Sequence, residues 1–195
     1  MNEALITKTL SEKLKEQTKS SHQNLERKLL KRLKIIEYKH EYAELLTYFY
    51  SFFGGLELCI NKNLNFDTLP DYSFRRKTSS ILNDLKSMDS ALPVLALKDA
   101  LPEISNHFQA LGALYVIEGS TLGGQIICRM LREQINDVDP KWFSFFGGYG
   151  DQTYLMWDVF KQAIDVIRKP EDEEMVIESA NDTFVQFSKW FEQNG

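Results

Sequence analysis

The sequence predicts an all-α protein with a single domain. Apolar residues recur every three or four positions in several segments, which is the spacing of one buried helix face, and no segment alternates convincingly as a strand. The chain of 195 residues is 43% hydrophobic, which is enough for one sizeable core, and we treat 1–195 as one domain. One long apolar segment, 111–130, contains glycines in its middle. We expect a kinked helix there, with the rest of the fold organised around it.

The first expected helix begins near residue 10 and has an apolar stripe that includes His22. Lys15, His22 and Glu26 lie within about 50° of one another on a helical wheel, so we expect a cation, an inward imidazole and a carboxylate in line. A lone inward histidine is more often a hydrogen-bonded core residue than an axial ligand to a metal or heme. Glu26, however, is placed to anchor the second ring nitrogen of a ligating His22. The spacing leaves both interpretations open.

The next expected helices span 38–60, about 72–86, about 152–169 and about 172–193. Gly54 and Gly55 could bend the first of these, and Pro170 is expected to end the third. Segment 143–150 is aromatic and has three glycines in its last four positions. It should form a loop that lies at the surface or lines a site.

The glycines of segment 111–130 need a physical reason, because each interior glycine costs a helix about 1 kcal/mol relative to alanine. Gly119 and Gly123 are four residues apart and therefore share one face, next to Gly124. A face without Cβ atoms suits either a tight helix–helix crossing or the floor of a site for a flat ligand. Spacing does not separate these two. A phosphate-binding loop is disfavoured because Gln125 and Ile126 stand where lysine and serine or threonine are required.

Composition narrows the classes of function. No run of eighteen apolar residues is present and the N-terminus is polar, so we expect a cytoplasmic protein that does not use a membrane. Cys59 and Cys128 lack metal-ligand spacing and are expected to be reduced core thiols. The net charge of −5 hides a basic segment at 8–39 and an acidic one at 171–195. Without interleaved aromatic residues the basic segment does not indicate nucleic-acid binding, and it fits an anionic small molecule or an acidic protein better.

Several catalytic and metal-binding motifs are missing. Glu37 and His40 form a solitary E-x-x-H, whereas a di-iron bundle needs two such motifs, and Glu103 with His107 lacks the H-E-x-x-H arrangement. We assign neither pair a metal. There is no nucleophile elbow and no dinucleotide-binding fingerprint after a strand, so hydrolase and dinucleotide-dependent functions are not indicated.

Three motifs resemble the heme oxygenase family. They are the segment Leu14–His22 with Glu26, the segment Leu111–Gln125, and the segment Phe146–Trp157. The first two match in order and separation, and the third is similar to the bacterial branch associated with phytochrome chromophore synthesis and iron release. The resemblance covers about residues 10–190 and implies a heme oxygenase-like fold with a glycine-kinked distal helix.

The resemblance implies that heme b is both cofactor and substrate, and that it is cleaved to biliverdin, carbon monoxide and ferrous iron. O2 and electrons from a reductase or a ferredoxin would be consumed. His22 would be the axial ligand of the heme iron, Glu26 its partner, and Lys15 a contact to a heme propionate. Gly119, Gly123 and Gly124 would lie over the heme. Ser120 stands where many members have an aspartate that orders distal water, so we count Gly119, Ser120 and Gly123 as the catalytic face.

One departure from the family supports an alternative function. Where family members place lysine or arginine against the propionates, this chain has Tyr154, Met156, Asp158 and Phe160, which leaves Lys161 as the nearby base. A non-catalytic heme-binding or heme-trafficking protein of the same fold would fit that loss. A relative that binds another small molecule, such as a thiamin fragment, would not need His22 with Glu26.

The basic N-terminal third predicts a protein partner. Cleavage of heme needs electrons delivered singly, and the chain has no motif for a flavin or an iron–sulfur centre. We expect an acidic electron donor such as a ferredoxin to dock there, and the resemblance implies a biliverdin reductase or a phytochrome as the acceptor of the product. The docking residues would be Lys13, Lys19, Arg27, Lys28, Lys31 and Arg32.

Overall fold

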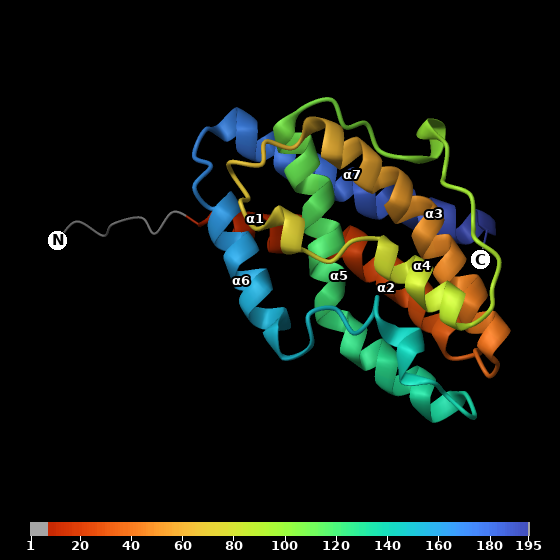
Figure 1. Cartoon of the computed structure of the whole chain (residues 1–195). Helices are drawn as coiled ribbons and strands as arrows, with labels where there is room; N and C mark the ends of the chain where they lie inside the picture. The colour runs from red at the N-terminus through yellow and green to blue at the C-terminus, as the bar shows by residue number, and fades with distance from the viewer. Residues whose placement is uncertain (1–7, 195) are drawn as a thin grey trace.

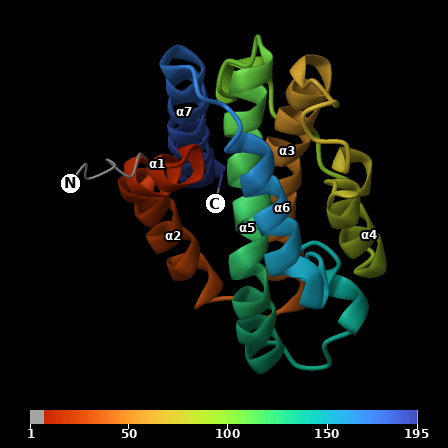
Figure 2. The ribbon, with the colours of Figure 1, turned by 90° about the vertical axis from the view of Figure 1, so that its left-hand side faces the viewer.

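The computed structural model describes residues 8–194, and within that range the protein is built from seven α-helices without a β-strand (Figure 1). The predicted all-α class is confirmed. The helix α5 (His107–Gln134) lies in the middle of the molecule in both views (Figures 1 and 2). It packs most extensively against α7 (Pro170–Asn194), and also against α3 (Lys39–Asn63) and α6 (Thr153–Ile164). Figure 1 shows α5 changing direction near its middle, where the glycines lie.

The expected first helix is two helices, α1 (Leu10–Gln17) and α2 (Lys19–Leu33), which meet at an angle (Figure 2). Thr9 starts α1 with a capping box that Glu12 completes. The break lies at Thr18, whose buried hydroxyl donates to the carbonyl oxygen of Leu14 at 2.7 Å. Such bonding of a threonine hydroxyl to its own helix bends the backbone, which explains the corner.

The third helix runs without interruption through Gly54 and Gly55, which lets another segment approach it closely. A Cβ atom at Gly54 would lie 2.6 Å from Leu95 Cδ2, and one at Gly55 would lie 3.1 Å from the carbonyl oxygen of Ala96. The amide of Ala96 donates to the carbonyl oxygen of Ser51 at 2.9 Å, just before the short 3-10 helix η2 (Lys98–Ala100). Glycine is therefore required here for packing between a helix and a loop.

The expected helix at 72–86 is divided into a 3-10 helix, η1 (Tyr72–Phe74), and α4 (Ser79–Ser87). Between them, Arg75 and Arg76 point toward α5, as described below. The aromatic loop at 143–150 is confirmed, and it is flanked by η3 (Pro140–Phe143) and η4 (Gly150–Gln152). The loop was expected at the surface or lining a site, and its two parts differ: Phe145 and Phe146 are buried in the core, whereas 147–149 are partly exposed and Gly150 is exposed. Asp84 of α4 fastens it by accepting the amides of Ser144 and Phe145 at 2.8 and 2.9 Å.

Two helix ends differ from expectation. The sixth helix ends at Ile164, several residues before the predicted end, and Pro170 opens α7 instead of stopping α6. Proline suits the first position of a helix because its missing N–H would have no partner there. The predicted inward face of α7 is confirmed, with Phe184, Phe187 and Phe191 buried. The expected single domain is consistent with one hydrophobic core, although residues 1–7 and 195 lie outside the described part of the chain.

Candidate functional site

The glycines of α5 fall into two groups with different surroundings. A Cβ atom at Gly112 would collide with the carbonyl oxygen of Val176 in α7, and one at Gly124 would collide with the carbonyl oxygen of Phe146. Both glycines therefore allow a backbone to approach α5 closely. For Gly124, which we expected to contact the cofactor, packing against the 143–150 loop explains the absence of a side chain.

Gly119 and Gly123 face open space instead. A Cβ atom at Gly119 would make only ordinary contacts of 3.7 and 3.9 Å with the ring of Trp157, and one at Gly123 would have no heavy atom of the described chain within 4 Å apart from its chain neighbours and the backbone of its own helix turn. Gly119 is half-buried and Gly123 is exposed. Close helix packing therefore does not account for these two positions, whereas a flat ligand lying on this face would.

His22 is exposed, which corrects the expectation that it faces inward. The buried side of α2 passes through Leu25 and Leu33, and His22 lies at its margin. Its ring packs against that of Phe184 in α7, with centroids 5.3 Å apart and planes at 58°. Within residues 8–194 its ring nitrogens make no hydrogen bond, so His22 is not a hydrogen-bonded core histidine and its nitrogens are free to bind a ligand.

The contact between the α1–α2 corner and α5 relates His22 to the glycines. Thr18 at this corner and Tyr115 on α5 are both buried. His22 follows Thr18 by one helical turn, Gly119 follows Tyr115 by one helical turn, and α2 and α5 run in the same direction (Figure 2). The two helices are in contact, so His22 and Gly119 lie on neighbouring helices that run in the same direction.

Lys15 and Glu26 are both exposed, and no hydrogen bond joins Glu26 to His22 in the described part of the chain. The structure thus places Lys15, His22 and Glu26 on the surface of α1 and α2 without linking them directly. On α6, Tyr154 and Asp158 are exposed, and Lys161 forms a salt bridge of 2.7 Å with Asp158. The remaining base of this helix is therefore partly neutralised.

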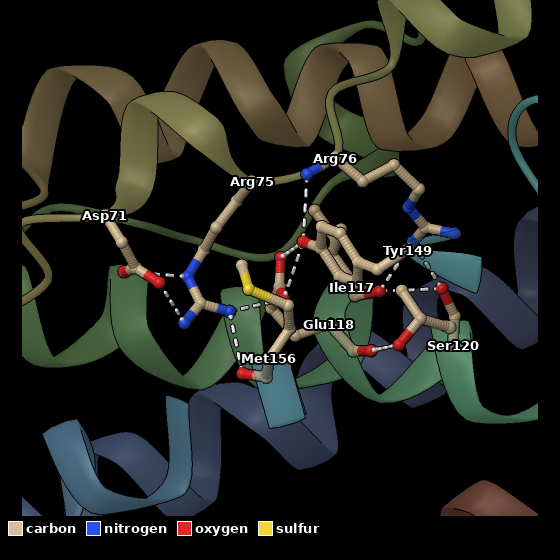
Figure 3. A network of polar contacts seen from close by, with 9 residues as sticks. Asp71, Arg75, Arg76, Ile117, Glu118, Ser120, Tyr149 and Met156 are labelled. Atoms are coloured by element: carbon tan, nitrogen blue, oxygen red, sulfur yellow. Dashed lines mark hydrogen bonds and ion pairs between the residues drawn. The ribbon is translucent and has the colours of Figure 1, made fainter. Parts of the chain in front are cut away.

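A buried polar network lies behind the glycine segment (Figure 3). Glu118, which is 1% exposed, accepts from Arg75 Nη1 at 2.6 Å and from the phenol of Tyr149 at 3.0 Å. Arg75 also binds both carboxylate oxygens of Asp71, at 3.1 and 2.8 Å. Burial and the charge of Glu118 raise the pKa of Tyr149, so its phenol stays protonated and donates. The charges of Glu118 and Arg75 are thereby compensated inside the protein.

Arg76 extends this network to Ser120. One of its terminal nitrogens, Nη2, donates to the carbonyl oxygen of Ile117 and to Ser120 Oγ, both at 2.7 Å. Nη1 donates to the carbonyl oxygen of Phe145 at 3.1 Å, and the guanidinium lies 4.1 Å from the centroid of the Phe145 ring. Burial lowers the pKa of Arg76, but an arginine remains charged at neutral pH.

Sequence reasoning missed this network, although one residue signalled it. Glu118 directly follows the apolar run Leu111–Ile117, and a carboxylate buried in an apolar helix requires a positive partner or several donors. That requirement predicts an arginine or lysine nearby in space. Nothing in the sequence shows that the partner is Arg75, more than forty residues earlier, or that Tyr149 is the second donor.

Half of the predicted docking residues have internal partners. Lys13 pairs with Glu173 at 2.5 Å, Lys28 with Glu192 at 2.7 Å, and Arg32 with Glu44 at 2.5 Å. Two of these partners lie on α7, so the acidic C-terminal helix partly neutralises the basic helices at the N-terminus. Lys19, Arg27 and Lys31 are exposed and form no salt bridge with the described residues.

The central helix is long and apolar enough to cross a membrane by composition alone, with a mean hydropathy of 1.2 over its best window. However, 67% of that window is buried inside the protein. Among the described residues α5 is therefore the core helix of an all-α fold.

Comparison with known proteins identifies close similarity to one family. Residues 8–193 match the family model described as heme oxygenase. A curated heme oxygenase from Xanthomonas campestris pv. campestris is 32% identical over 97 residues, which are 48% of this chain and 54% of that protein. The alignment thus spans about half the length of this curated relative.

Solved structures share the whole fold at lower identity. A heme oxygenase from Neisseria meningitidis, solved with NO and CO bound, superposes with a TM-score of 0.80 at 19% identity, covering 96% of this chain and 92% of the other. Heme oxygenase 2 from Chlamydomonas reinhardtii gives 0.78 at 18% identity and covers 96% and 98%. Heme oxygenase-1 from Synechocystis, solved in complex with heme, gives 0.75 at 19% identity and covers 95% and 92%. These likenesses establish that the fold is heme oxygenase-like.

Proposed function

We propose, from the premise that the chain belongs to the heme oxygenase family, that it binds heme b between α2 and the open face of α5 and cleaves it to biliverdin, carbon monoxide and ferrous iron. The reaction consumes O2 and electrons from a partner. Heme supplies the iron at which O2 is reduced, and the protein supplies position and surroundings.

The observation that carries this proposal is the open space at Gly119 and Gly123. Two glycines in a helix cost about 2 kcal/mol relative to alanine, and packing accounts for Gly112 and Gly124 but not for this pair. A planar ring lying on the backbone of α5 would use the missing Cβ atoms at both positions. The indole of Trp157, next to Gly119, adds an apolar contact on the same side.

His22 fits the role of axial ligand on the opposite helix. Its ring is exposed, so it needs no rearrangement to reach a ligand, and Phe184 restricts its rotation from one side. Glu26 lies one helical turn away, in reach of the second ring nitrogen through a water molecule. Lys15 is exposed on α1 and is the base we propose for a heme propionate.

A heme-carrying protein without turnover is the second candidate, and the observation that favours it is the charge on α6. Asp158 stands beside the one nearby base, Lys161, and would repel a propionate instead of binding it. A lost charge-assisted hydrogen bond is worth about 1.5–3 kcal/mol, so heme would be held less firmly on this side. Weaker binding of heme is compatible with its release to another protein as well as with its cleavage.

Addition of hemin and then of a reducing system to the purified protein separates these functions. Appearance of biliverdin absorbance supports the oxygenase, a stable Soret band without product supports the carrier, and the absence of a Soret band refutes both. His22→Ala should abolish or strongly alter the ferric spectrum. His40→Ala is the matched control, because His40 is also exposed and lies on another helix. An unaltered spectrum in His22→Ala would refute the assignment of the ligand.

The electron donor is proposed to be an acidic protein, such as a ferredoxin or a reductase, that docks on α2 at Lys19, Arg27 and Lys31. These side chains have no internal acidic partner among the described residues, unlike Lys28 and Arg32. Opposite charges on the two proteins would mainly raise the rate of association. We place the reaction in the cytoplasm, with a biliverdin reductase or a phytochrome as the acceptor of biliverdin.

A further inference from the structure

The two neighbouring arginines of the buried network have different electrostatic surroundings. Arg75 is enclosed by two carboxylates, those of Asp71 and Glu118. Arg76 forms no salt bridge with the described residues, and its guanidinium is held by two carbonyl oxygens, one hydroxyl and an aromatic ring. The network as a whole is neutral, but its charge is distributed unevenly. The carboxylate of Asp71 lies at one end of the network. The guanidinium of Arg76, which binds Ser120, lies at the other end (Figure 3).

Ser120 connects that positive end to the glycine face. It follows Gly119 directly in α5, and its hydroxyl accepts from Arg76 while donating to the carbonyl oxygen of Ile117 at 2.6 Å. The single hydroxyl proton is therefore already used within the helix. Both Ser120 and Arg76 are partly exposed, and Ser120 lies about 100° around α5 from Gly119.

The position of Arg76 is well fixed. Its backbone amide donates to the phenol of Tyr149 at 2.9 Å, and that phenol donates to Glu118. Nε of Arg76 is buried and has no hydrogen-bond partner within residues 8–194, so the guanidinium is held by its terminal nitrogens and by the Phe145 ring. A guanidinium anchored in this way keeps its position when negative charge forms on a ligand beside Gly119. It therefore stabilises that charge without reorganisation of the protein.

We propose that Arg76 is a positioning residue that fixes Ser120 and makes the space beside Gly119 favour anionic ligands over neutral ones. The proposal rests on the proposed function, because it concerns the side of the heme that faces α5. During the reaction, negative charge develops on oxygen as electrons arrive, and a fixed positive charge behind α5 stabilises it. Arg76 acts through Ser120 and through its field, without touching the substrate.

The test compares an anionic and a neutral ligand on the ferric heme complex at pH 7. Azide and imidazole are titrated separately into the complexes of the wild type, Arg76→Gln and Arg76→Lys, and the Soret shift gives each dissociation constant. Arg76→Gln should weaken azide about tenfold, equivalent to about 1.4 kcal/mol, and leave imidazole within about twofold. Arg76→Lys keeps the charge and should restore most of the azide affinity. The matched control is Arg129→Gln, which removes an exposed arginine further along α5 and should change neither constant.

The outcomes distinguish the two proposals. A wild type that binds no hemin refutes the proposed function. A wild type that binds hemin, with azide and imidazole weakened equally in Arg76→Gln, shows that Arg76 only maintains the shape of α5 and overturns the inference. Unchanged azide binding in Arg76→Gln overturns it as well. If Arg76→Gln fails to fold, Arg76→Lys is used for the test, because it keeps the positive charge. Its ratio of azide affinity to imidazole affinity should then be close to that of the wild type. A ratio more than about fivefold lower contradicts a role for the charge.

Discussion

Gly123 and Gly124 are neighbours in sequence, and replacing each should have opposite consequences. Alanine at Gly123 meets no heavy atom of the described chain within 4 Å, so it should gain about 1 kcal/mol of helix propensity. For a chain of this length that raises the Tm of the heme-free protein by about 2–4 °C. Alanine at Gly124 would press its Cβ atom into the carbonyl group of Phe146, and overpacking against a backbone that cannot rotate away costs about 3 kcal/mol. After the gain in propensity, the net loss is about 2 kcal/mol and the Tm falls by about 4–8 °C.

The same pair tests the site when hemin binding is measured beside thermal unfolding. The Cβ atom of Gly123→Leu would point into open space, so its heme-free Tm should equal or slightly exceed that of the wild type while hemin affinity and turnover fall at least about tenfold. Gly124→Ala should lower stability and, at temperatures where it is folded, bind hemin as the wild type does. Normal hemin binding by Gly123→Leu would refute the proposal that this face accommodates heme. A stable Gly124→Ala would refute the packing role.

Three further predictions concern charge. Glu118→Gln leaves the buried cation of Arg75 with one carboxylate instead of two and should cost about 3–5 kcal/mol in urea unfolding; a loss below about 1 kcal/mol would contradict a buried ion pair. Burial raises the pKa of Asp84 from 3.8 to about 6, so its contribution to stability is greatest below about pH 4 and is lost as the pH rises through 6; Asp84→Asn should remove about 2 kcal/mol of the difference in unfolding free energy between pH 4.5 and pH 6.5. Replacing Lys19 and Lys31 by glutamate should slow turnover driven by a ferredoxin but not turnover driven by ascorbate, whereas equal slowing of both would place these residues in heme binding or folding.

Local patterns predicted the helices well because a buried face repeats with the helical period. The segments that became α3, α5 and α7 all carry that repeat, and most of their apolar positions are buried, with Leu58, Ile126 and Val185 as exposed exceptions. The corner at Thr18 was missed because it depends on one hydroxyl bonding to Leu14, and the helical repeat continues through it. The division of 72–86 was missed because Arg75 and Arg76 are held by groups distant in sequence.

The basic surface shows how sequence alone overestimates a charged patch. Lys28 and Arg32 lie in a basic segment, which predicted that their side chains bind an acidic partner protein. In the folded chain Lys28 meets Glu192 of α7 and Arg32 meets Glu44 of α3. Charge reversal at either position would replace a salt bridge by two neighbouring carboxylates, so its effect on turnover would not report docking alone. A test of docking must therefore use residues such as Lys19 and Lys31, which the fold leaves without a salt bridge among the described residues.

The glycines of α5 show most clearly what the sequence could not decide. Gly112, Gly119 and Gly123 lie within about 40° of one another at 100° per residue, so a helical wheel treats them as one face. In the structure that face is closed at Gly112 by the backbone of α7, where Ser179 Oγ also donates to the carbonyl oxygen of Gln109 at 2.7 Å. Further along the same face, Gly119 meets only the edge of Trp157 and Gly123 meets nothing of the described chain within 4 Å. The course of α7 thus makes one stripe of glycines a packing surface at Gly112 and leaves it open at Gly119 and Gly123.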